Sequence, residues 1–346
     1  MLRQNSLAMT ASIPMAAILG CAGPVLQPDE GAFFRARNPL GFILFARNCE
    51  TPQQLRRLTQ DLRSAVGRPD APVLMDHEGG RVQRLPHPPW RKVPPPAAFA
   101  ALPSPTAATA VRLNAQLMAM ELLDLGVDVN CVPCLDVNDP AGHHVIGDRA
   151  YSISPDVVAQ LGRALVEGLA RGGVLPVIKH MPGHGRALVD SHLELPVVEA
   201  TFEALAERDF VPFKALADVP LGMTAHVLYP DLDGDHPATL SQAIIDGVIR
   251  RHIGFDGLLL TDDLSMQALG GDIGQQAAKA LAAGCDVALH CNGKMAEMQA
   301  VAAHVQALSG AAMARWQNAR LWSAQRRQAA EDVSHQALAV ELAALI

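Results

Sequence analysis

The chain has 346 residues, of which 49% are hydrophobic and 18% charged, and its formal net charge is −7. This composition supplies a large apolar core and excludes a disordered chain, while the negative charge gives no electrostatic basis for binding nucleic acid or an anionic membrane. The length exceeds one average domain but fits a single α/β barrel, so we expect one domain over residues 1–346.

Residues 1–3 are followed by an apolar stretch that ends at residue 21 and faintly resembles a lipoprotein cleavage site. Gln4, Asn5 and Pro14 interrupt the segment and only one basic residue precedes it, so we interpret residues 14–22 as a buried first strand. No run of about 18 or more apolar residues occurs elsewhere, and we therefore expect no membrane-spanning segment. The six cysteines are scattered through apolar, strand-like segments, which is typical of reduced thiols in a cytoplasmic protein.

Short apolar runs alternate along the chain with segments of helical periodicity. Runs that are apolar throughout are typical of parallel strands covered by helices. The expected strands are Ala16–Cys21, Gly41–Phe45, Pro72–Asp76, Val127–Pro133, Leu175–His180, Leu221–His226, Gly257–Asp262 and Asp286–His290. The expected helices are Pro52–Val66, Thr106–Leu125, Ser154–Gly172, Glu203–Asp218, Ser241–His252, Ile273–Ala283 and Lys294–Leu308.

This alternation predicts an α/β fold, namely a single (β/α)8 TIM-type barrel over about residues 13–310. A doubly wound open sheet is the alternative, but it usually has fewer strands and a glycine-rich first turn, which is missing here. Extra C-terminal helices are predicted over about residues 311–346, and we expect them to pad the outside of the barrel. The proline-rich segment 85–105 follows the third strand, and we interpret it as a rigid loop rather than a docking motif.

Polar residues stand where the apolar runs end. They are Asp76, Lys179, His180, His226, Asp262, Asp263 and His290. In a barrel the carboxyl ends of the strands converge on one mouth, where active sites of this fold lie. Helix capping explains a residue such as Asp263, but it does not explain a Lys-His pair or several histidines at successive strand ends. The sequence therefore predicts an active site at this mouth.

Three segments carry a family resemblance. They are Asp76–Arg84, Lys179–Gly185 with the following Asp190-Ser191-His192, and Leu260–Met266. With them the sequence resembles glycoside hydrolase family 3, and within it the single-domain bacterial β-N-acetylhexosaminidases of the NagZ type. The resemblance runs from about residue 13 to 293 and includes the linking pieces 130–138, 223–226 and 283–286. The block Lys-His-Met-Pro-Gly-His-Gly followed by Asp-Ser-His is its most specific part.

The resemblance implies a retaining mechanism with a covalent glycosyl-enzyme intermediate. Strand parity alone leaves open whether Asp262 or Asp263 faces the mouth. The family pattern assigns Asp262 as nucleophile, with Asp263 as a cap, and it gives His192 the proton-transfer role with Asp190 as partner. It also implies that the terminal sugar is held by Asp76, Arg84, Arg149, Lys179 and His180. No metal or cofactor is implied.

The implied substrate is a small soluble saccharide that carries N-acetylglucosamine, such as an anhydro-muropeptide, cut from its non-reducing end during cell-wall recycling in the cytoplasm. The aromatic content of 4% agrees with a short substrate, because few platforms for a long polysaccharide are present. The second block departs from the family pattern at two points. Met181 replaces an aromatic residue, and residues 186–188 replace an Asp-Thr sequence.

Three alternatives are weighed against this interpretation. A metal hydrolase would use Asp76-His77-Glu78 or His180 with His184, but the first strand lacks the His-x-His that is usual in such barrels. A family 3 β-glucosidase usually carries a second domain, and only about 50 residues follow the last strand here. A non-catalytic sugar-binding barrel would not need the complete set of Asp262, His192 and Asp190.

Overall fold

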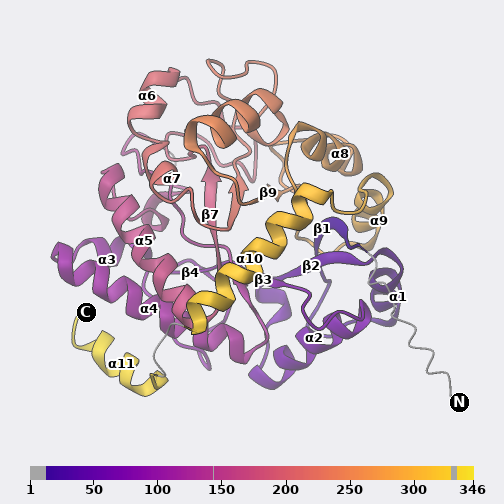
Figure 1. The fold of residues 1–346 in the computed structure, drawn as a ribbon, viewed down its shortest axis with the longest axis horizontal. Helices are drawn as coiled ribbons and strands as arrows, with labels where there is room; N and C mark the ends of the chain where they lie inside the picture. Colours follow the sequence, from indigo (N-terminus) through magenta and orange to yellow (C-terminus); the bar gives the residue numbers. More distant parts are fainter. Residues whose placement is uncertain (1–12, 143, 329–332) are drawn as a thin grey trace, which may run out of the picture.

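A computed structural model of the protein describes residues 13–142, 144–328 and 333–346. Eight strands close a barrel in which every neighbouring pair is parallel (Figure 1). In order around the barrel they are β1 (Met15–Gly20), β2 (Pro39–Leu44), β3 (Val73–Met75), β6 (Val129–Asn130), β7 (Leu175–Met181), β8 (Leu221–Thr224), β9 (Leu258–Asp263) and β10 (Val287–His290). Each lies in or overlaps one predicted strand, so the prediction of a (β/α)8 barrel is confirmed.

The first strand shows why these segments form the barrel wall. All six residues of β1 are buried, and β1 pairs with β2 on one side and β10 on the other. A strand with helices outside and packed side chains inside has no solvent face, so its sequence is apolar throughout. The apolar stretch near the start of the chain is therefore a central barrel strand, as predicted.

Helices cover the barrel on the outside. They are α1 (Pro28–Arg37), α2 (Pro52–Ala65), α3 (Pro96–Ala100), α4 (Ser104–Asp124), α5 (Pro155–Gly172), α6 (Phe202–Glu207), α7 (Val211–Ala215), the π-type helix η4 (Ala243–Ile253), α8 (Ile273–Ala283) and α9 (Met295–His304). Short 3-10 turns occur at η1 (Ala46–Asn48), η2 (Gly147–Arg149) and η3 (Ala238–Leu240). A small hairpin of β4 (His77–Gly79) and β5 (Val82–Gln83) follows β3.

The structure differs from the predicted helices in three places. Helix α3 lies within residues 85–105, which we interpreted as a rigid loop. Helix α1 was not predicted, because Glu30 and Phe34 are its only buried residues and leave little apolar periodicity. The helix predicted over 203–218 is instead two short helices, α6 and α7. Pro212 lies at the start of α7, and a proline ring disfavours helical geometry in the residue before it.

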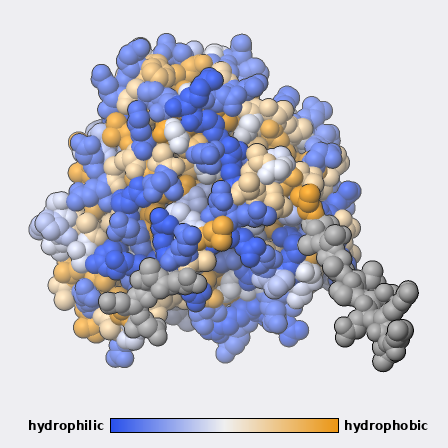
Figure 2. Space-filling view, in the orientation of Figure 1, coloured by the Kyte–Doolittle hydropathy of each residue, from blue (hydrophilic) through white to orange (hydrophobic). Residues whose placement is uncertain are grey.

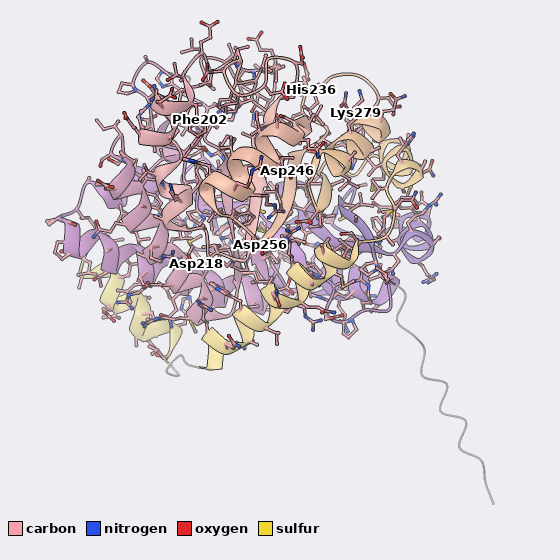
Figure 3. All side chains as sticks on the ribbon, turned by 45° about the horizontal axis from the view of Figure 1, so that its top comes forward. Phe202, Asp218, His236, Asp246, Asp256 and Lys279 are labelled. Atoms are coloured by element: carbon pink, nitrogen blue, oxygen red, sulfur yellow. The ribbon has the colours of Figure 1, made fainter. Side chains whose placement is uncertain are left out.

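The C-terminal helix α10 (Gly310–Gln328) crosses one end of the barrel (Figure 1). Arg315 forms ion pairs with Asp256 at 2.8 Å and Asp286 at 3.0 Å, and Arg320 pairs with Asp70 at 2.6 Å. Each aspartate directly precedes or lies just before a strand, and Figure 3 shows Asp256 beside this helix. Helix α10 therefore closes the amino-terminal end of the barrel, where we expected padding on the outside.

The last helix, α11 (His335–Ala343), does pack on the outside, against α4, where His335 lies 3.1 Å from Glu121. The face that α10 crosses is a mosaic of hydrophilic and hydrophobic side chains (Figure 2).

Among the described residues no helix is both long and apolar enough to span a bilayer. All six cysteines lie in the described part of the chain as buried free thiols. The carboxyl ends of the strands lie at the opposite end from α10.

Candidate active site

A cavity of about 400 Å³ lies at the carboxyl ends of the strands. All eight predicted site residues line it: Asp76, Arg84, Arg149, Lys179, His180, Asp190, His192 and Asp262. This volume falls within the range of about 300–1,000 Å³ that is usual for small-molecule sites. A larger cavity of about 610 Å³ lies between α4, α5, α10 and α11, and none of the predicted site residues line it. The chemistry therefore belongs to the cavity at the barrel mouth.

One wall of the cavity is a row of alternating charges. Lys179 is 2% exposed, and its Nζ lies 2.8 Å from Asp76 Oδ1 and 2.8 Å from Glu78 Oε1. Arg84 Nη2 lies 3.3 Å from the other oxygen of Asp76. Arg149 donates from Nε and Nη2 to the two oxygens of Glu78, at 2.9 and 2.8 Å. Glu78 was considered in the sequence only as a metal ligand, and its position two residues after Asp76 was the available signal.

The row stays ionised because its charges support one another. Burial alone would raise the pKa of Asp76, but Lys179 and Arg84 outweigh it and hold the pKa below its usual range. Burial also acts to raise the pKa of Glu78, and Arg149 with Lys179 holds it far below. The two carboxylates in turn raise the pKa of Lys179 despite its burial. These fixed charges are suited to hydrogen-bonding vicinal hydroxyl groups.

Arg84 has a hydrogen-bond donor that is unpaired in the part of the chain that the structure describes. Its guanidinium lies 4.8 Å from the centre of the Phe45 ring, which fixes the plane of the group against the cavity wall. The Nε of Arg84 is buried and has no hydrogen-bond partner among the described residues. A buried donor that stays unpaired costs about 1–3 kcal/mol, so the position favours a ligand that would accept this bond.

Asp262 and Asp263 have different surroundings. Both oxygens of Asp263 are engaged, with Ser265 N at 3.0 Å, Ser265 Oγ at 2.6 Å and Cys291 N at 3.1 Å. Asp262 Oδ1 accepts a 2.8 Å bond from the Asp263 backbone N–H. Burial acts to raise the pKa of Asp262, but His180, His226 and this backbone bond hold it below its usual value. Asp262 is therefore a carboxylate that is ionised near neutral pH and lines the cavity.

The Asp190–His192 pair lies on the loop that follows β7. His192 Nδ1 is 2.6 Å from Asp190 Oδ1, and the same oxygen accepts the His192 backbone N–H at 2.9 Å. The His192 side chain is 61% exposed. Between the two, Ser191 is buried and its Oγ lies 3.1 Å from His184 Nε2. The loop thus presents one imidazole to solvent while its middle residue is held by the protein.

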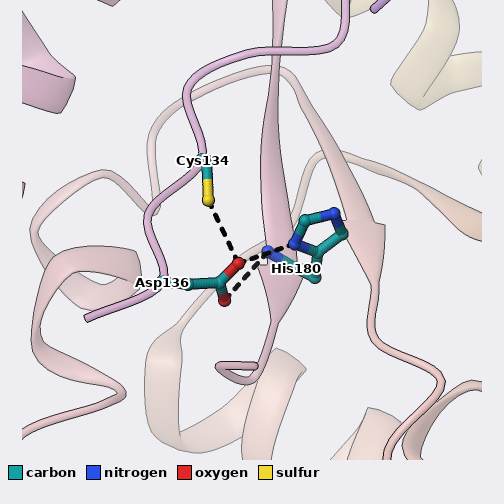
Figure 4. A group of neighbouring side chains, drawn as sticks. All are labelled: Cys134, Asp136 and His180. Atoms are coloured by element: carbon teal, nitrogen blue, oxygen red, sulfur yellow. Dashed lines mark hydrogen bonds and ion pairs between the residues drawn. The ribbon is translucent and has the colours of Figure 1, made fainter. Parts of the chain in front are cut away.

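A second Asp–His pair was missed in the sequence. Asp136 is fully buried, and its Oδ2 lies 2.6 Å from His180 Nδ1 and 3.2 Å from Cys134 Sγ (Figure 4). Its Oδ1 accepts the backbone N–H of His184 at 2.6 Å. Asp136 belongs to the segment 130–138, which entered the family resemblance without a role. Its place after a strand, like that of the other polar residues at strand ends, was the signal that could have found it.

Two predicted strand-end histidines do not line the cavity. His226 is buried, with Nδ1 2.7 Å from Thr239 Oγ1 and Nε2 3.1 Å from the Asp263 carbonyl oxygen. His290 is also buried, and its Nε2 lies 3.2 Å from Glu297 Oε2. Both tie a strand to its neighbours, so the expectation that every polar strand end converges on the site was wrong for these two.

Comparison with known proteins identifies the family. Residues 36–322 match the N-terminal domain of glycosyl hydrolase family 3. The chain belongs to glycosyl hydrolase family 3. A curated β-hexosaminidase of Bordetella avium is 42% identical to this hydrolase over 285 residues, which cover 78% of this chain and 81% of the relative. That of Methylobacillus flagellatus is 41% identical over 267 residues, 75% of each chain.

Solved structures agree with this assignment. NagZ from Neisseria gonorrhoeae, in complex with N-trifluoroacetyl-D-glucosamine, superposes with a TM-score of 0.84 and 31% identity over 96% of this chain and 98% of that one. A family 3 β-N-acetylglucosaminidase from Paenibacillus sp. has a TM-score of 0.79 and 32% identity, covering 92% and 62%. This family 3 protein is therefore a glycoside hydrolase, and the cavity at its barrel mouth contains a half-buried carboxylate, an exposed imidazole and a charged wall.

Proposed function

We propose that this hydrolase is a retaining exo-β-N-acetylglucosaminidase in which Asp262 is the nucleophile and His192, assisted by Asp190, transfers the proton. One observation carries the proposal: the Asp262 carboxylate lines the same cavity as an Asp–His pair whose imidazole is exposed. Retaining hydrolysis needs a nucleophile on one face of the sugar and a proton donor at the leaving oxygen. The two groups have these chemical properties.

The reaction follows in two steps. Asp262 attacks the anomeric carbon and forms an ester bond to the sugar, while His192 gives its proton to the departing oxygen and the glycosidic bond breaks. His192, now neutral, takes a proton from water, and the resulting nucleophile attacks the anomeric carbon and releases Asp262. Asp190 accepts the Nδ1–H of His192 in both steps, which keeps the proton-carrying Nε2 toward the substrate.

The charged wall would bind the terminal sugar. Asp76, Arg84 and Lys179 offer acceptors and donors to neighbouring hydroxyls, His180 adds an imidazole, and Arg149 reaches the sugar or holds Glu78 and Lys179 in place. The β-hexosaminidases named above and the sugar analogue in the gonococcal complex support an N-acetylhexosamine at this position. A cavity of about 400 Å³ supports a single terminal sugar and cleavage from the non-reducing end.

The finer substrate that we propose is a small soluble saccharide derived from peptidoglycan, such as an anhydro-muropeptide, hydrolysed in the cytoplasm during cell-wall recycling. The chemistry is complete with one carboxylate nucleophile and one Asp–His pair, so we expect no metal or organic cofactor to be needed. Exhaustive chelation should leave the rate unchanged, and a rate lost on chelation and restored by zinc or magnesium would contradict this part.

The deciding experiment measures release from four substrates: a chromogenic N-acetyl-β-glucosaminide, the matching glucoside and N-acetylgalactosaminide, and a chitin oligomer blocked at its non-reducing end. We expect the glucoside to react about ten- to a hundredfold more slowly, because its site donors stay unpaired. NMR should detect the β-anomer as the first product. Equal rates on the glucoside favour a β-glucosidase, cleavage of the blocked oligomer contradicts an exo site, and no turnover at all favours a sugar-binding barrel.

A further inference from the structure

The Asp136 carboxylate accepts hydrogen bonds from two backbone groups and two side chains. Its Oδ1 accepts from the backbone N–H groups of His184, at 2.6 Å, and His180, at 3.4 Å. Its Oδ2 accepts from His180 Nδ1, at 2.6 Å, and from the thiol of Cys134, at 3.2 Å. Oδ1 therefore binds backbone N–H groups, whereas Oδ2 binds the His180 ring and the Cys134 thiol.

We propose that Asp136 is a positioning residue of the hydrolytic site, which fixes the His180 imidazole in the Nδ1–H tautomer beside Asp262. The inference rests on the proposed function, because it concerns the same cavity. An ionised carboxylate accepts hydrogen bonds and donates none, so the ring nitrogen that faces Asp136 carries the proton. Figure 4 shows the other ring nitrogen on the side away from Asp136. That nitrogen is the one His180 can turn to the substrate.

The charge of Asp136 is secured by its surroundings. Burial would raise the pKa of its carboxyl, but His180 and the hydrogen bonds from His180 and His184 hold it well below the usual range. His180 lines the cavity together with Asp262. A change at Asp136 should therefore alter the cavity of the nucleophile through the His180 ring that the two residues have between them.

A metal centre is the competing interpretation. Among the described residues, Cys134, Asp136 and His180 form the one group in which three possible ligand atoms lie within 4.8 Å of one another. Burial and the nearby Asp136 carboxylate raise the pKa of the Cys134 thiol well above its usual value, so it stays protonated. Both oxygens of Asp136 already accept bonds from N–H or S–H groups. The short distances within the group are those of hydrogen bonds from Cys134 and His180 to Asp136, so hydrogen bonding accounts for the arrangement.

The test uses Asp136→Asn, which separates the roles of the two oxygens. The amide oxygen still accepts the His184 backbone N–H, whereas the NH₂ group replaces the acceptor of His180 Nδ1–H. The ring then loses its bond or switches tautomer. Replacing the carboxylate of a catalytic triad by asparagine costs about four orders of magnitude in kcat. His180 carries no proton in the reaction, so we expect a smaller loss, about 100- to 1,000-fold in kcat/KM.

The leaving group supplies the readout that distinguishes positioning from proton transfer. We expect Asp136→Asn to slow an activated aryl glycoside and an unactivated disaccharide by the same factor, within about threefold, and to slow covalent trapping by a fluorinated sugar likewise. A rate within about threefold of the native enzyme on both substrates would overturn the proposal. So would a loss confined to the unactivated substrate, since that would place the effect in the His192 loop.

Two controls test the route through His180. Cys134→Ala removes the other donor to Oδ2 and leaves the ring bond, so we expect less than about a threefold change. In a His180→Ala background, Asp136→Asn should add less than about threefold, because residues that act through each other are not additive. Full multiplication of the two losses would show that Asp136 acts elsewhere and would overturn the proposal.

A measurement on the unmodified enzyme covers the case in which Asp136→Asn does not fold. The ¹⁵N NMR shifts of His180, assigned by their loss in His180→Ala, report which ring nitrogen carries the proton. A protonated Nδ1 supports the proposal, and a neutral ring protonated at Nε2 alone overturns it. This measurement needs no substrate. If the native enzyme fails to release N-acetylglucosamine, the proposed function fails, whereas failure of the tautomer or of the mutant series removes only the role of Asp136.

Discussion

Two Asp–His pairs line or support the same cavity, and they share little beyond their hydrogen bond. In each pair the imidazole Nδ1 lies 2.6 Å from a carboxylate oxygen. The side chains of Asp136 and His180 are 0% and 8% exposed, whereas those of Asp190 and His192 are 24% and 61% exposed. One pair is buried between β7 and the segment that follows β6, and the other lies on a loop at the mouth.

The difference in exposure agrees with the different roles proposed for the two imidazoles. A group that gives a proton to the leaving oxygen and takes another from water must exchange with solvent between steps, and an exposed ring can do so. A group that holds a sugar beside the nucleophile must keep one orientation and one tautomer, and burial provides both. The same residue pair can therefore serve for proton transfer or for positioning, according to its exposure.

The largest expected effect lies outside both pairs. Asp262→Ala removes the covalent path that both pairs serve, so we expect turnover to fall by about four or more orders of magnitude while the fold persists. The matched control is Asp263→Asn, whose carboxylate holds Ser265 and the Cys291 backbone, and which should lose far less. A fluorinated substrate analogue should leave its sugar on Asp262, as mass spectrometry of peptides can show. A label on Asp263 or Asp76 would contradict the assignment.

His192→Ala should give the next largest loss, and it should depend on the leaving group. General acid–base catalysis contributes about 10²- to 10⁴-fold, which a natural disaccharide needs in full. An aryl glycoside with a good leaving group needs little protonation, so its first step should suffer far less. Rates of the first step on both substrates, measured by product burst, check this prediction. Equal losses on the two substrates would show that the exposed pair does not transfer the proton.

Asp190→Ala should follow the pattern of His192→Ala at smaller size, about 10- to 100-fold on the disaccharide. The carboxylate orients the imidazole and favours its charged form but carries no proton to the substrate. Asp136→Asn is the matched variant in the buried pair, and it should slow both substrates alike. If Asp190→Ala also proved independent of the leaving group, the contrast between the two pairs would disappear.

The sequence predicted the barrel well, and it predicted the residues of the site that lie in recognisable motifs. Strands such as β1 are apolar throughout because they have no solvent face, so they stand out without any knowledge of their neighbours. Helix α1 was missed because its packing rests on two residues. The α10 ion pairs that close the barrel end were missed because they join residues distant in the chain.

The same limit applies within the site. Asp262 and His192 were found because short motifs surround them. The roles of Glu78 and Asp136 depend on Lys179 and His180, which lie 101 and 44 positions further along the chain. Nothing in the local sequence fixes those pairings, since only closure of the barrel brings β3, β6 and β7 side by side. Polar strand ends predicted His226 and His290 equally well, although neither lines the cavity and both hydrogen-bond to other parts of the protein.

The smallest expected effect is on stability. Its dependence on pH should differ between a variant of the buried pair and a variant of the exposed pair. The pKa of Asp136 is depressed in the folded state, as are those of Asp76 and Glu78. A depressed carboxyl pKa means that the folded state binds fewer protons than the unfolded chain. The stabilisation is therefore complete above the unfolded pKa of about 4 and declines as the pH falls toward the folded value.

Asp136→Asn should consequently lower the unfolding temperature at pH 7 by a few degrees, because hydrogen bonds to a charged group contribute about 1.5–3 kcal/mol. The deficit should shrink as the pH falls from about 5 to 3, where the native carboxylate begins to lose its own contribution. Asp190→Asn removes a carboxylate whose partner is largely exposed, and such pairs contribute about 0–1 kcal/mol, so its curve should run close to that of the native enzyme throughout. Calorimetry of the three proteins across this range gives the comparison directly. Parallel curves for Asp136→Asn and the native enzyme would mean that Asp136 is not held ionised by the fold, and the physical distinction between the buried and the exposed pair would then be lost.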